Sequence, residues 1–441
     1  MLFKSRFQTR SSRASVQPTA AAVASLPVTA GPFSDNWRAS SAAVAELAEG
    51  LDFIFDQVNY EEEPDDLLRL HLERLTEEAA KYANSRMGDC EGLEWSCSHE
   101  LAQLLYTACQ CSCLVYDPVA TSGPELIPIL TRSPVHLEAV LQGALIVSVR
   151  GTANVVDHMV NLNSEPKDAS SILSFSTKDK SIQAHKGFLV CAKSLIPYLT
   201  QEIAHQLELD SSLSDVIFTG HSAGGSVSSL VFLHMISQTP AHLSSMRFSL
   251  ATFGCAPVIS SNLTPVLMKF SNVGWAYAFV NEYDMVPRAD QPYIRSLVDL
   301  YRSRHGLPCL HMPSDPDVQQ SSEHDVAKCN VVGDETMERK KHWPLPAAAY
   351  QLVGDIIILQ QRLDTALLSD ASSDTATITP MPLKLHKIST DAFANLLFCD
   401  VGAHKRRVYL QRMELMATGM VRTPSFGSDD DDTLYPVASE N

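Results

Sequence analysis

Short apolar runs alternate with longer segments of helical periodicity between about residue 99 and residue 416. Apolar, β-branched or aromatic runs predict strands at 145–149, 216–218, 248–253, 275–280 and 353–359. Helical spacing predicts helices at 100–116, 187–199 with a continuation over 201–207, 226–237 and 405–416. Strands that alternate with helices favour a mostly parallel sheet with helices on both faces. The predicted fold class is therefore α/β.

The segments around this body differ from it in pattern. Residues 1–42 are rich in Ser, Ala, Thr and Pro, which is typical of a disordered segment. Residues 43–98 are predicted to form a helical extension, with helices at 43–57 and 65–86. The body, residues 99–417, carries polar insertions near 313–341 and 365–382. Residues 418–441 form an acidic tail that is predicted to be disordered.

The composition is globular and strongly acidic. Of the 441 residues 45% are hydrophobic and 19% charged, and the formal net charge is −17. Because such a surface repels phosphate backbones, we expect no nucleic-acid partner. No run reaches ~18 consecutive apolar residues, so no transmembrane helix is predicted.

The N-terminus lacks the apolar core of a signal peptide, which favours a cytoplasmic location. Its Arg- and Ser-rich character leaves a mitochondrial transit peptide as the alternative. Most of the ten cysteines lie in apolar stretches and are predicted to be reduced, buried thiols. No cysteine or histidine spacing indicates a metal site, and we expect neither a metal nor another cofactor.

Residues 216–225, Val-Ile-Phe-Thr-Gly-His-Ser-Ala-Gly-Gly, join a predicted strand to a predicted helix. They fit the pattern Gly-x-Ser-x-Gly, in which a tight turn lifts the serine above the edge of the sheet. The crowded turn needs small neighbours, here Gly220, Ala223 and Gly224. The first amides of the helix can stabilise an oxyanion. Ser222 is therefore the predicted nucleophile.

A nucleophilic serine also needs a second oxyanion donor and an acid. The strand at 145–149 leads into residues 150–152, and the amide of Thr152 is the candidate donor, with a plain turn as the alternative. Asp284 follows the strand at 275–280, and Pro287 restricts the loop directly after it. Glu282 and Asp290 are rival acids. Residue types leave the base open among several downstream histidines, which are His305, His311, His324, His342, His386 and His404.

Five segments, in this order, resemble the class 3 lipase family, which includes the diacylglycerol lipases. They are residues 149–152, 185–188, 220–225, 252–257 and 280–288, and the resemblance spans about 99–415. It implies an α/β-hydrolase fold, with Ser222 as nucleophile, Asp284 as acid, and Thr152 and Ala223 as oxyanion residues. The resemblance also implies that His185 shapes the fold and does not act as base.

In the family the catalytic histidine follows a further strand and opens a helix, with an aromatic residue a few positions on. The strand at 353–359 and the helix at 405–416 match that description, so His404 is the predicted base. His342 precedes the strand and is the alternative.

The resemblance implies hydrolysis of the ester bonds of mono-, di- or triacylglycerols, with transient contact to a lipid surface on intracellular membranes or lipid droplets. Two other functions remain open. One is a catalytically inactive lipase-like protein that serves in signalling or as a scaffold. The other is a carboxylesterase that acts on non-lipid esters, although such enzymes are normally secreted.

Residues 153–162 follow Thr152 and could act as a lid, because Val155, Val156, Met159 and Val160 give them an apolar face. If a lipid interface holds this segment open, ester hydrolysis should rise when a substrate passes from monomers to an emulsion. Rates measured on both sides of the solubility limit test this. A rate that follows the monomer concentration alone would contradict the lid.

Overall fold

The computed structural model describes residues 66–88, 92–116, 129–132, 143–151, 165–175, 182–311, 340–361 and 382–418. All of them fall within one contact unit, residues 40–441. The predictions for residues 1–42, the helix at 43–57 and the segment 153–162 lie outside the described residues, and so do nearly all residues of the two insertions and the acidic tail.

An eight-stranded sheet forms the centre of the fold, in the order β1-β10-β9-β8-β7-β6-β3-β2. Strands β3, β6, β7, β8 and β9 pair in parallel, whereas β2, β10 and β1 pair antiparallel to their neighbours at the two edges. The bounds are β1 Leu93–Glu94, β2 Ile129–Arg132, β3 Ala144–Ser148, β6 Asp215–His221, β7 Arg247–Phe253, β8 Val273–Asn281, β9 Asp355–Gln360 and β10 Lys384–Ile388. A separate antiparallel pair consists of β4 Pro166–Asp168 and β5 Gln183–His185.

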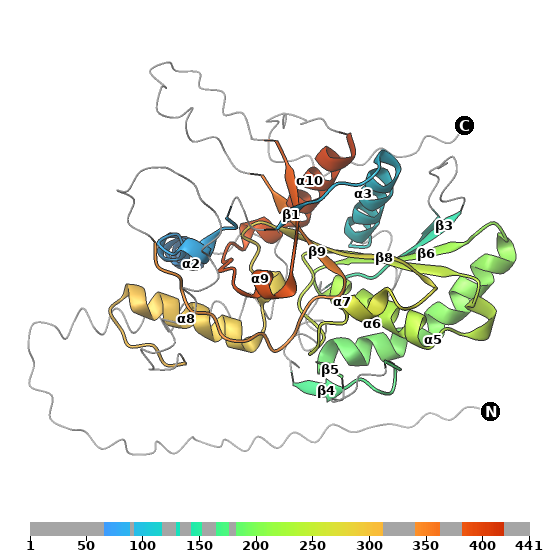
Figure 1. Ribbon diagram of the computed structural model, residues 1–441, viewed down its shortest axis with the longest axis horizontal. Helices are drawn as coiled ribbons and strands as arrows, with labels where there is room; N and C mark the ends of the chain where they lie inside the picture. The colour runs from blue at the N-terminus through green and yellow to red at the C-terminus, as the bar shows by residue number, and fades with distance from the viewer. Residues whose placement is uncertain are drawn as a thin grey trace, which may run out of the picture. The chain divides into compact units, whose positions relative to one another are not determined.

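Helices cover both faces of the sheet, as Figure 1 shows, with α5 and α6 on one side and α3 and α10 on the other. The helices are α2 Asp66–Ala79, α3 His99–Leu114, α5 Lys186–Leu209, α6 Ala223–Ser237, α7 Thr264–Leu267, α8 Gln291–Arg304, α9 Thr390–Ala394 and α10 Arg406–Thr418. Short 3-10 helices are η1 Ala83–Ser85, η2 Ala241–Leu243, η3 Val286–Arg288 and η6 Gly402–His404. The predicted α/β class is confirmed.

Strand residues alternate between the two layers. In β6, Val216 and Phe218 pack with α5 and α6, and Ile217 packs with α3. Because both faces are buried, the strand is apolar at successive positions and shows no alternation of polar and apolar residues. The five predicted strands and four predicted helices of the body are all present, and their ends differ from the predicted ends by at most three residues.

Parallel pairing brings the carboxyl ends of the central strands to one edge. His221 of β6 pairs with Phe253 of β7, and Asn281 of β8 pairs with Leu359 of β9. The predicted nucleophile follows β6 and the predicted acid follows β8. The fold therefore places both residues at the same edge of the sheet, where α/β enzymes bind their ligands.

The N-terminal extension packs against the body through α2. Leu72, Leu75 and Ala79 belong to one buried cluster with Met285 and other residues of the Asp284 loop and α8. Asn84, in η1, donates a hydrogen bond to the carbonyl oxygen of Trp343 at 2.9 Å and accepts one from the Trp343 amide at 2.9 Å. In the described residues, α2 and η1 thus share a core with the segment that carries the predicted acid.

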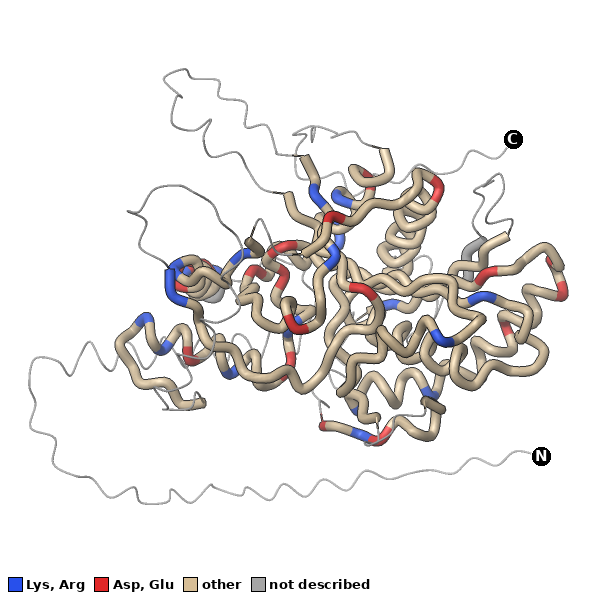
Figure 2. The backbone as a smooth tube through the Cα atoms, in the orientation of Figure 1, with Lys and Arg blue, Asp and Glu red and all other residues tan. Residues whose placement is uncertain are grey.

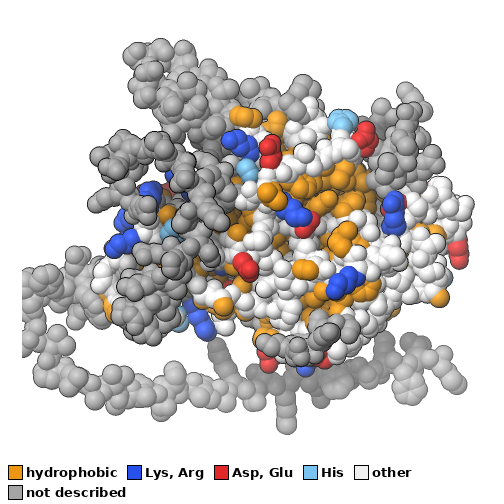
Figure 3. Space-filling view, in the orientation of Figure 1, with side chains coloured by type: hydrophobic (Ala, Val, Ile, Leu, Met, Phe, Trp, Pro, Cys, Tyr) orange, Lys and Arg blue, Asp and Glu red, His pale blue; other side chains and the backbone are white. Residues whose placement is uncertain are grey.

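Charged residues are sparse on the central strands and lie mainly on the surrounding helices and loops (Figure 2). On the face drawn in Figure 3, hydrophobic side chains gather near the centre, and basic and acidic side chains are scattered among and around them. The negative net charge is not concentrated into one acidic patch on this face.

Replacing Leu75 with Ala should lower the free energy of unfolding by about 2–5 kcal/mol, because this fully buried side chain would leave a cavity under the Asp284 loop. Leu70 lies on the same helix and is 39% exposed, so Leu70→Ala should change that free energy by about 0.5 kcal/mol or less. Urea unfolding of the two variants measures the difference. Equal, small effects would mean that α2 does not share the core.

Candidate active site

The turn between β6 and α6 holds Ser222 in a strained conformation. Its φ is 57° and its ψ is −132°, and the serine is buried. A Cβ added to Gly220 would lie 2.5 Å from the carbonyl carbon of Gly224, and one added to Gly224 would collide with the carbonyl oxygen of Val149. Only glycine fits at both positions, which is the crowding expected of a nucleophile elbow.

The loop that leaves β3 lies directly against this turn. A Cβ on Gly151 would lie 2.8 Å from the carbonyl oxygen of His221 and 3.3 Å from the amide nitrogen of Gly224. Ala223, a predicted oxyanion residue, opens α6 and is buried. The other predicted oxyanion residue, Thr152, lies one position beyond Gly151 and outside the described residues.

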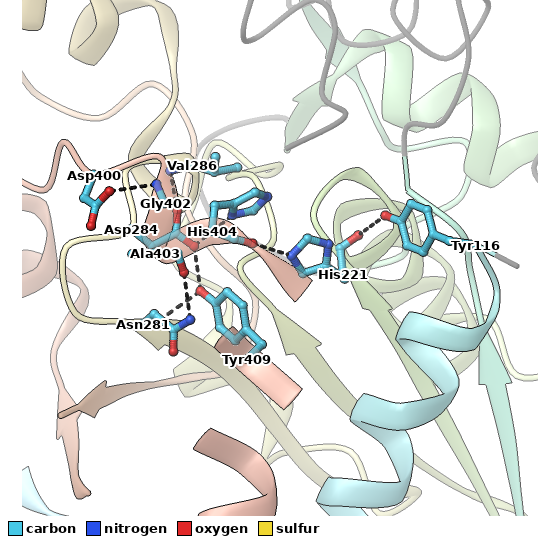
Figure 4. A network of polar contacts seen from close by, with 10 residues as sticks. All are labelled: Tyr116, His221, Asn281, Asp284, Val286, Asp400, Gly402, Ala403, His404 and Tyr409. Carbon is cyan, nitrogen blue, oxygen red and sulfur yellow. Dashed lines mark hydrogen bonds and ion pairs between the residues drawn. The ribbon is translucent and has the colours of Figure 1, made fainter. Parts of the chain in front are cut away.

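Asp284 is fully buried in the turn that follows β8. Its Oδ1 accepts a hydrogen bond from the Val286 amide at 2.9 Å. Its Oδ2 accepts one from the Tyr409 hydroxyl at 2.6 Å and lies 2.8 Å from Nδ1 of His404 (Figure 4). Because a carboxylate only accepts hydrogen bonds, Nδ1 is the donor, and in the neutral ring this puts the lone pair on Nε2.

His404 is also fully buried and closes the 3-10 helix η6. The ring centroids of His404 and His221 lie 4.6 Å apart, and His221 Nε2 donates a hydrogen bond to the His404 carbonyl oxygen at 2.9 Å. Since His221 directly precedes Ser222, the structure brings His404 beside both Asp284 and the nucleophile turn. These residues are separated by more than a hundred positions in the chain.

Backbone and side-chain contacts fix the loop that carries His404. Asn281 donates a side-chain hydrogen bond to the carbonyl oxygen of Ala403 at 2.8 Å. Asp400 accepts one from the amide of Gly402 at 2.7 Å, and its own amide donates to the carbonyl oxygen of Tyr283 at 2.9 Å. Burial raises the pKa of the Asp400 carboxyl, against the lowering effect of its backbone hydrogen bonds.

The backbone before Asp284 is strained as well. Tyr283 and Ser222 are the two non-glycine residues with positive φ in the part of the chain that the structure describes, at 78° and 57°. Such conformations cost of order 1–3 kcal/mol each and cluster at functional sites. The two strained residues are the nucleophile itself and the neighbour of the acid.

The rival acids have other contacts. Glu282 accepts hydrogen bonds from the amide of Met87 and the side chain of Gln360, each at 3.3 Å. Asp290 caps the N-terminus of α8 and holds the backbone of Ala349, and burial raises the pKa of its carboxyl. None of these contacts of Glu282 and Asp290 involves a histidine.

Two other histidines differ from His404 in their surroundings. His342 is exposed, in contrast to the buried His404. The ring of His185 stacks on Phe188, with the centroids 4.2 Å apart.

Three residues of this network were not assigned a role from the sequence. They are Asn281, Asp400 and Tyr409, which hold the loop of His404 or the carboxylate of Asp284. The aromatic residue expected a few positions after the base was a signal for Tyr409, and Asn281 lies within the quoted segment 280–288. Asp400 carried no signal, because its hydrogen bond depends on how the loop folds.

In the described part of the chain, no group of three or more His, Cys, Asp or Glu side chains could hold a metal ion. None of the eight described cysteines forms a disulfide, and six of them are buried, as predicted. Among the described helices none is long and apolar enough to cross a membrane.

The model of the class 3 lipase family matches residues 146–293. This segment contains β3, the turn at Ser222, and Asp284, whereas His404 lies beyond it. Over this segment the chain is similar to the class 3 lipase family.

Several solved structures are similar to the chain. A lipase–propeptide complex from Rhizomucor miehei has 18% identity and a TM-score of 0.32, over 47% of this chain and 74% of that one. A lipase from Rhizopus microsporus var. chinensis has 16% identity and a TM-score of 0.35, over 48% and 78%. A triacylglycerol lipase from Penicillium expansum has 11% identity and a TM-score of 0.35, over 70% and 99%. No curated protein sequence matches the chain.

The buried ring of His221 predicts a loss of stability in acid. Burial first, and then the neighbouring His404, lowers the pKa of His221 well below its ordinary value of 6.5. The unfolded chain therefore binds a proton that the folded chain does not, and the free energy of unfolding should fall as the pH drops below 6.5. Urea unfolding at pH 7.5, 6 and 5 measures this slope.

A His221→Gln variant keeps an N–H donor for the His404 carbonyl but does not titrate. Its free energy of unfolding should fall less between pH 7.5 and pH 5 than that of the wild type. An unchanged slope would show that other groups cause the acid sensitivity.

Proposed function

We propose that this protein hydrolyses carboxylic ester bonds of acylglycerols, with Ser222 as nucleophile, His404 as base and Asp284 as the acid that orients it. The observation that carries the proposal is the buried 2.8 Å contact between Asp284 Oδ2 and His404 Nδ1, next to the turn that holds Ser222. The class 3 lipase match over residues 146–293 supports the same chemistry.

In the acylation step, the Ser222 hydroxyl attacks the ester carbonyl and gives its proton to Nε2 of His404. The resulting imidazolium is stabilised by the Asp284 carboxylate. The oxyanion of the tetrahedral intermediate accepts hydrogen bonds from the amides of Ala223 and Thr152. When the carbon–oxygen bond breaks, His404 returns the proton to the leaving glycerol oxygen, and the acyl group stays on Ser222.

In the deacylation step, a water molecule attacks the acyl-enzyme carbonyl and gives a proton to His404. A second tetrahedral intermediate then expels Ser222, which takes the proton back, and a fatty acid leaves. The Tyr409 hydroxyl and the Val286 amide support this cycle because they hold the Asp284 carboxylate in one orientation.

Acylglycerols are the proposed substrates because the family is one of lipases, and the diacylglycerol lipase-like subtype is the narrower form of the proposal. The protein is proposed to work in the cytoplasm and to contact membranes or lipid droplets transiently. A panel of p-nitrophenyl esters of rising chain length, followed by mono-, di- and triacylglycerol emulsions, tests the substrate class. Hydrolysis of short esters alone would favour a non-lipid carboxylesterase, and no hydrolysis at all would favour an inactive scaffold.

Replacing Ser222 with Ala should lower the rate of ester hydrolysis by about 10³-fold or more. The residues of a catalytic unit depend on one another, so the loss of one costs about as much activity as the loss of all. Alanine is small enough for the turn, so the variant should fold. Hydrolysis of p-nitrophenyl butyrate and a thermal melt measure the two effects. Retained activity in a homogeneous preparation would refute Ser222 as nucleophile.

The base is tested by two separate substitutions. His404→Ala should lower hydrolysis about as strongly as the loss of Ser222, since both belong to the same unit. His342→Ala should leave hydrolysis near the wild-type rate, because the side chain is exposed. The reverse pattern, in variants that melt like the wild type, would move the base to His342.

A further inference from the structure

Tyr116 lies where three segments of the proposed site meet. It follows α3 by two residues, and its hydroxyl donates a hydrogen bond to the carbonyl oxygen of His221 at 3.4 Å (Figure 4). The rings of Tyr116 and His221 meet edge to face, with centroids 6.3 Å apart. Tyr116 thus contacts the residue that directly precedes the nucleophile.

The same hydroxyl contacts the loop that leaves β3. The amide of Gly151, the residue directly before Thr152, lies close enough to this hydroxyl to lower its pKa. A Cβ added to Gly151 would collide with the Tyr116 hydroxyl oxygen, so only glycine lets the phenol fit between the loop and the turn. One oxygen atom therefore joins the two segments from which the oxyanion donors are proposed to come.

The third segment is the one that carries His404. The guanidinium carbon of Arg406 lies 4.1 Å from the centroid of the Tyr116 ring, which is the geometry of a cation–π contact. Burial raises the pKa of the Tyr116 hydroxyl well above its ordinary value, and the nearby Arg406 opposes this only in part. The phenol is therefore neutral and can donate and accept at the same time.

We propose that Tyr116 is a positioning residue for the oxyanion hole, because its hydroxyl holds Gly151, in the loop that leaves β3, against the turn that precedes Ala223. This role rests on the proposed function. Oxyanion donors must lie within 2.7–3.1 Å of the developing charge, and a displacement of about 1 Å can cost about 10²-fold in rate. Because these hydrogen bonds are made mainly in the transition state, their loss should lower kcat and leave KM little changed.

The first test removes only the oxygen. Tyr116→Phe keeps the ring and its contact with Arg406, and kcat for p-nitrophenyl butyrate should fall about 10- to 100-fold, with KM within about threefold of the wild type. Tyr106→Phe is the matched control, because it deletes the same atom from a tyrosine within α3, about 15 Å away by the rise of a helix. That control should keep the wild-type kcat and KM.

A transition-state analogue separates positioning from general stability. An alkyl trifluoromethyl ketone forms a tetrahedral oxyanion on the serine, and its affinity for Tyr116→Phe should fall in parallel with kcat. A Tyr116→Phe variant with wild-type kcat would overturn the proposal, and so would a lower kcat with unchanged affinity for the ketone. If Tyr116→Phe does not fold, kcat and the affinity for the ketone are measured for Arg406→Met instead. This substitution removes the cation–π contact that holds the Tyr116 ring.

The wild-type measurements distinguish a failure of the proposed function from a failure of the proposed role of Tyr116. A wild-type protein that neither hydrolyses the ester nor binds the ketone overturns the proposed function and the role of Tyr116 with it. A wild-type protein that does both, together with an unaffected Tyr116→Phe, overturns the role of Tyr116 alone.

Discussion

The buried contact between Asp284 and His404 is the constraint on which the rest of the site depends. Both side chains are fully buried and lie 120 positions apart in the chain. A buried carboxylate is tolerated only when its oxygens are hydrogen-bonded, and here the Val286 amide, the Tyr409 hydroxyl and the imidazole meet that requirement. These donors come from the Asp284 turn itself and from the C-terminal segment, so the carboxylate can be buried only when that segment is folded against β8.

That requirement explains why regions outside the family match are built into the core. The segment matched by the family ends at residue 293, before His404 and Tyr409. Helix α2, from the N-terminal extension, belongs to the same buried cluster as Met285 and Val286 of the Asp284 loop. Segments on both sides of the family match thus share a core or a hydrogen bond with the Asp284 turn, and disruption of either segment should perturb Asp284.

Local sequence patterns predicted the nucleophile turn and the strands of the parallel sheet. Ser222 is marked by the small residues that its turn needs, and the strands of the parallel sheet are marked by continuous apolar runs, because both faces are covered. Strand β10, with its sequence Lys-Leu-His-Lys-Ile, was missed because it is short, charged and close to the edge of the sheet. From the residues alone the base stayed open, since the contact of a histidine with Asp284 is long-range. The family resemblance, and not the local pattern, selected His404.

The most direct test of the central claim is the identity of the serine that the folded site activates. The protein is incubated with a fluorophosphonate, and its intact mass and peptide masses are then measured. An activated Ser222 predicts one adduct per chain, on the peptide that contains residue 222, and none when the protein is unfolded before labelling. An adduct on a different serine, or no adduct on the folded protein, would contradict the claim that the His404–Asp284 pair activates Ser222.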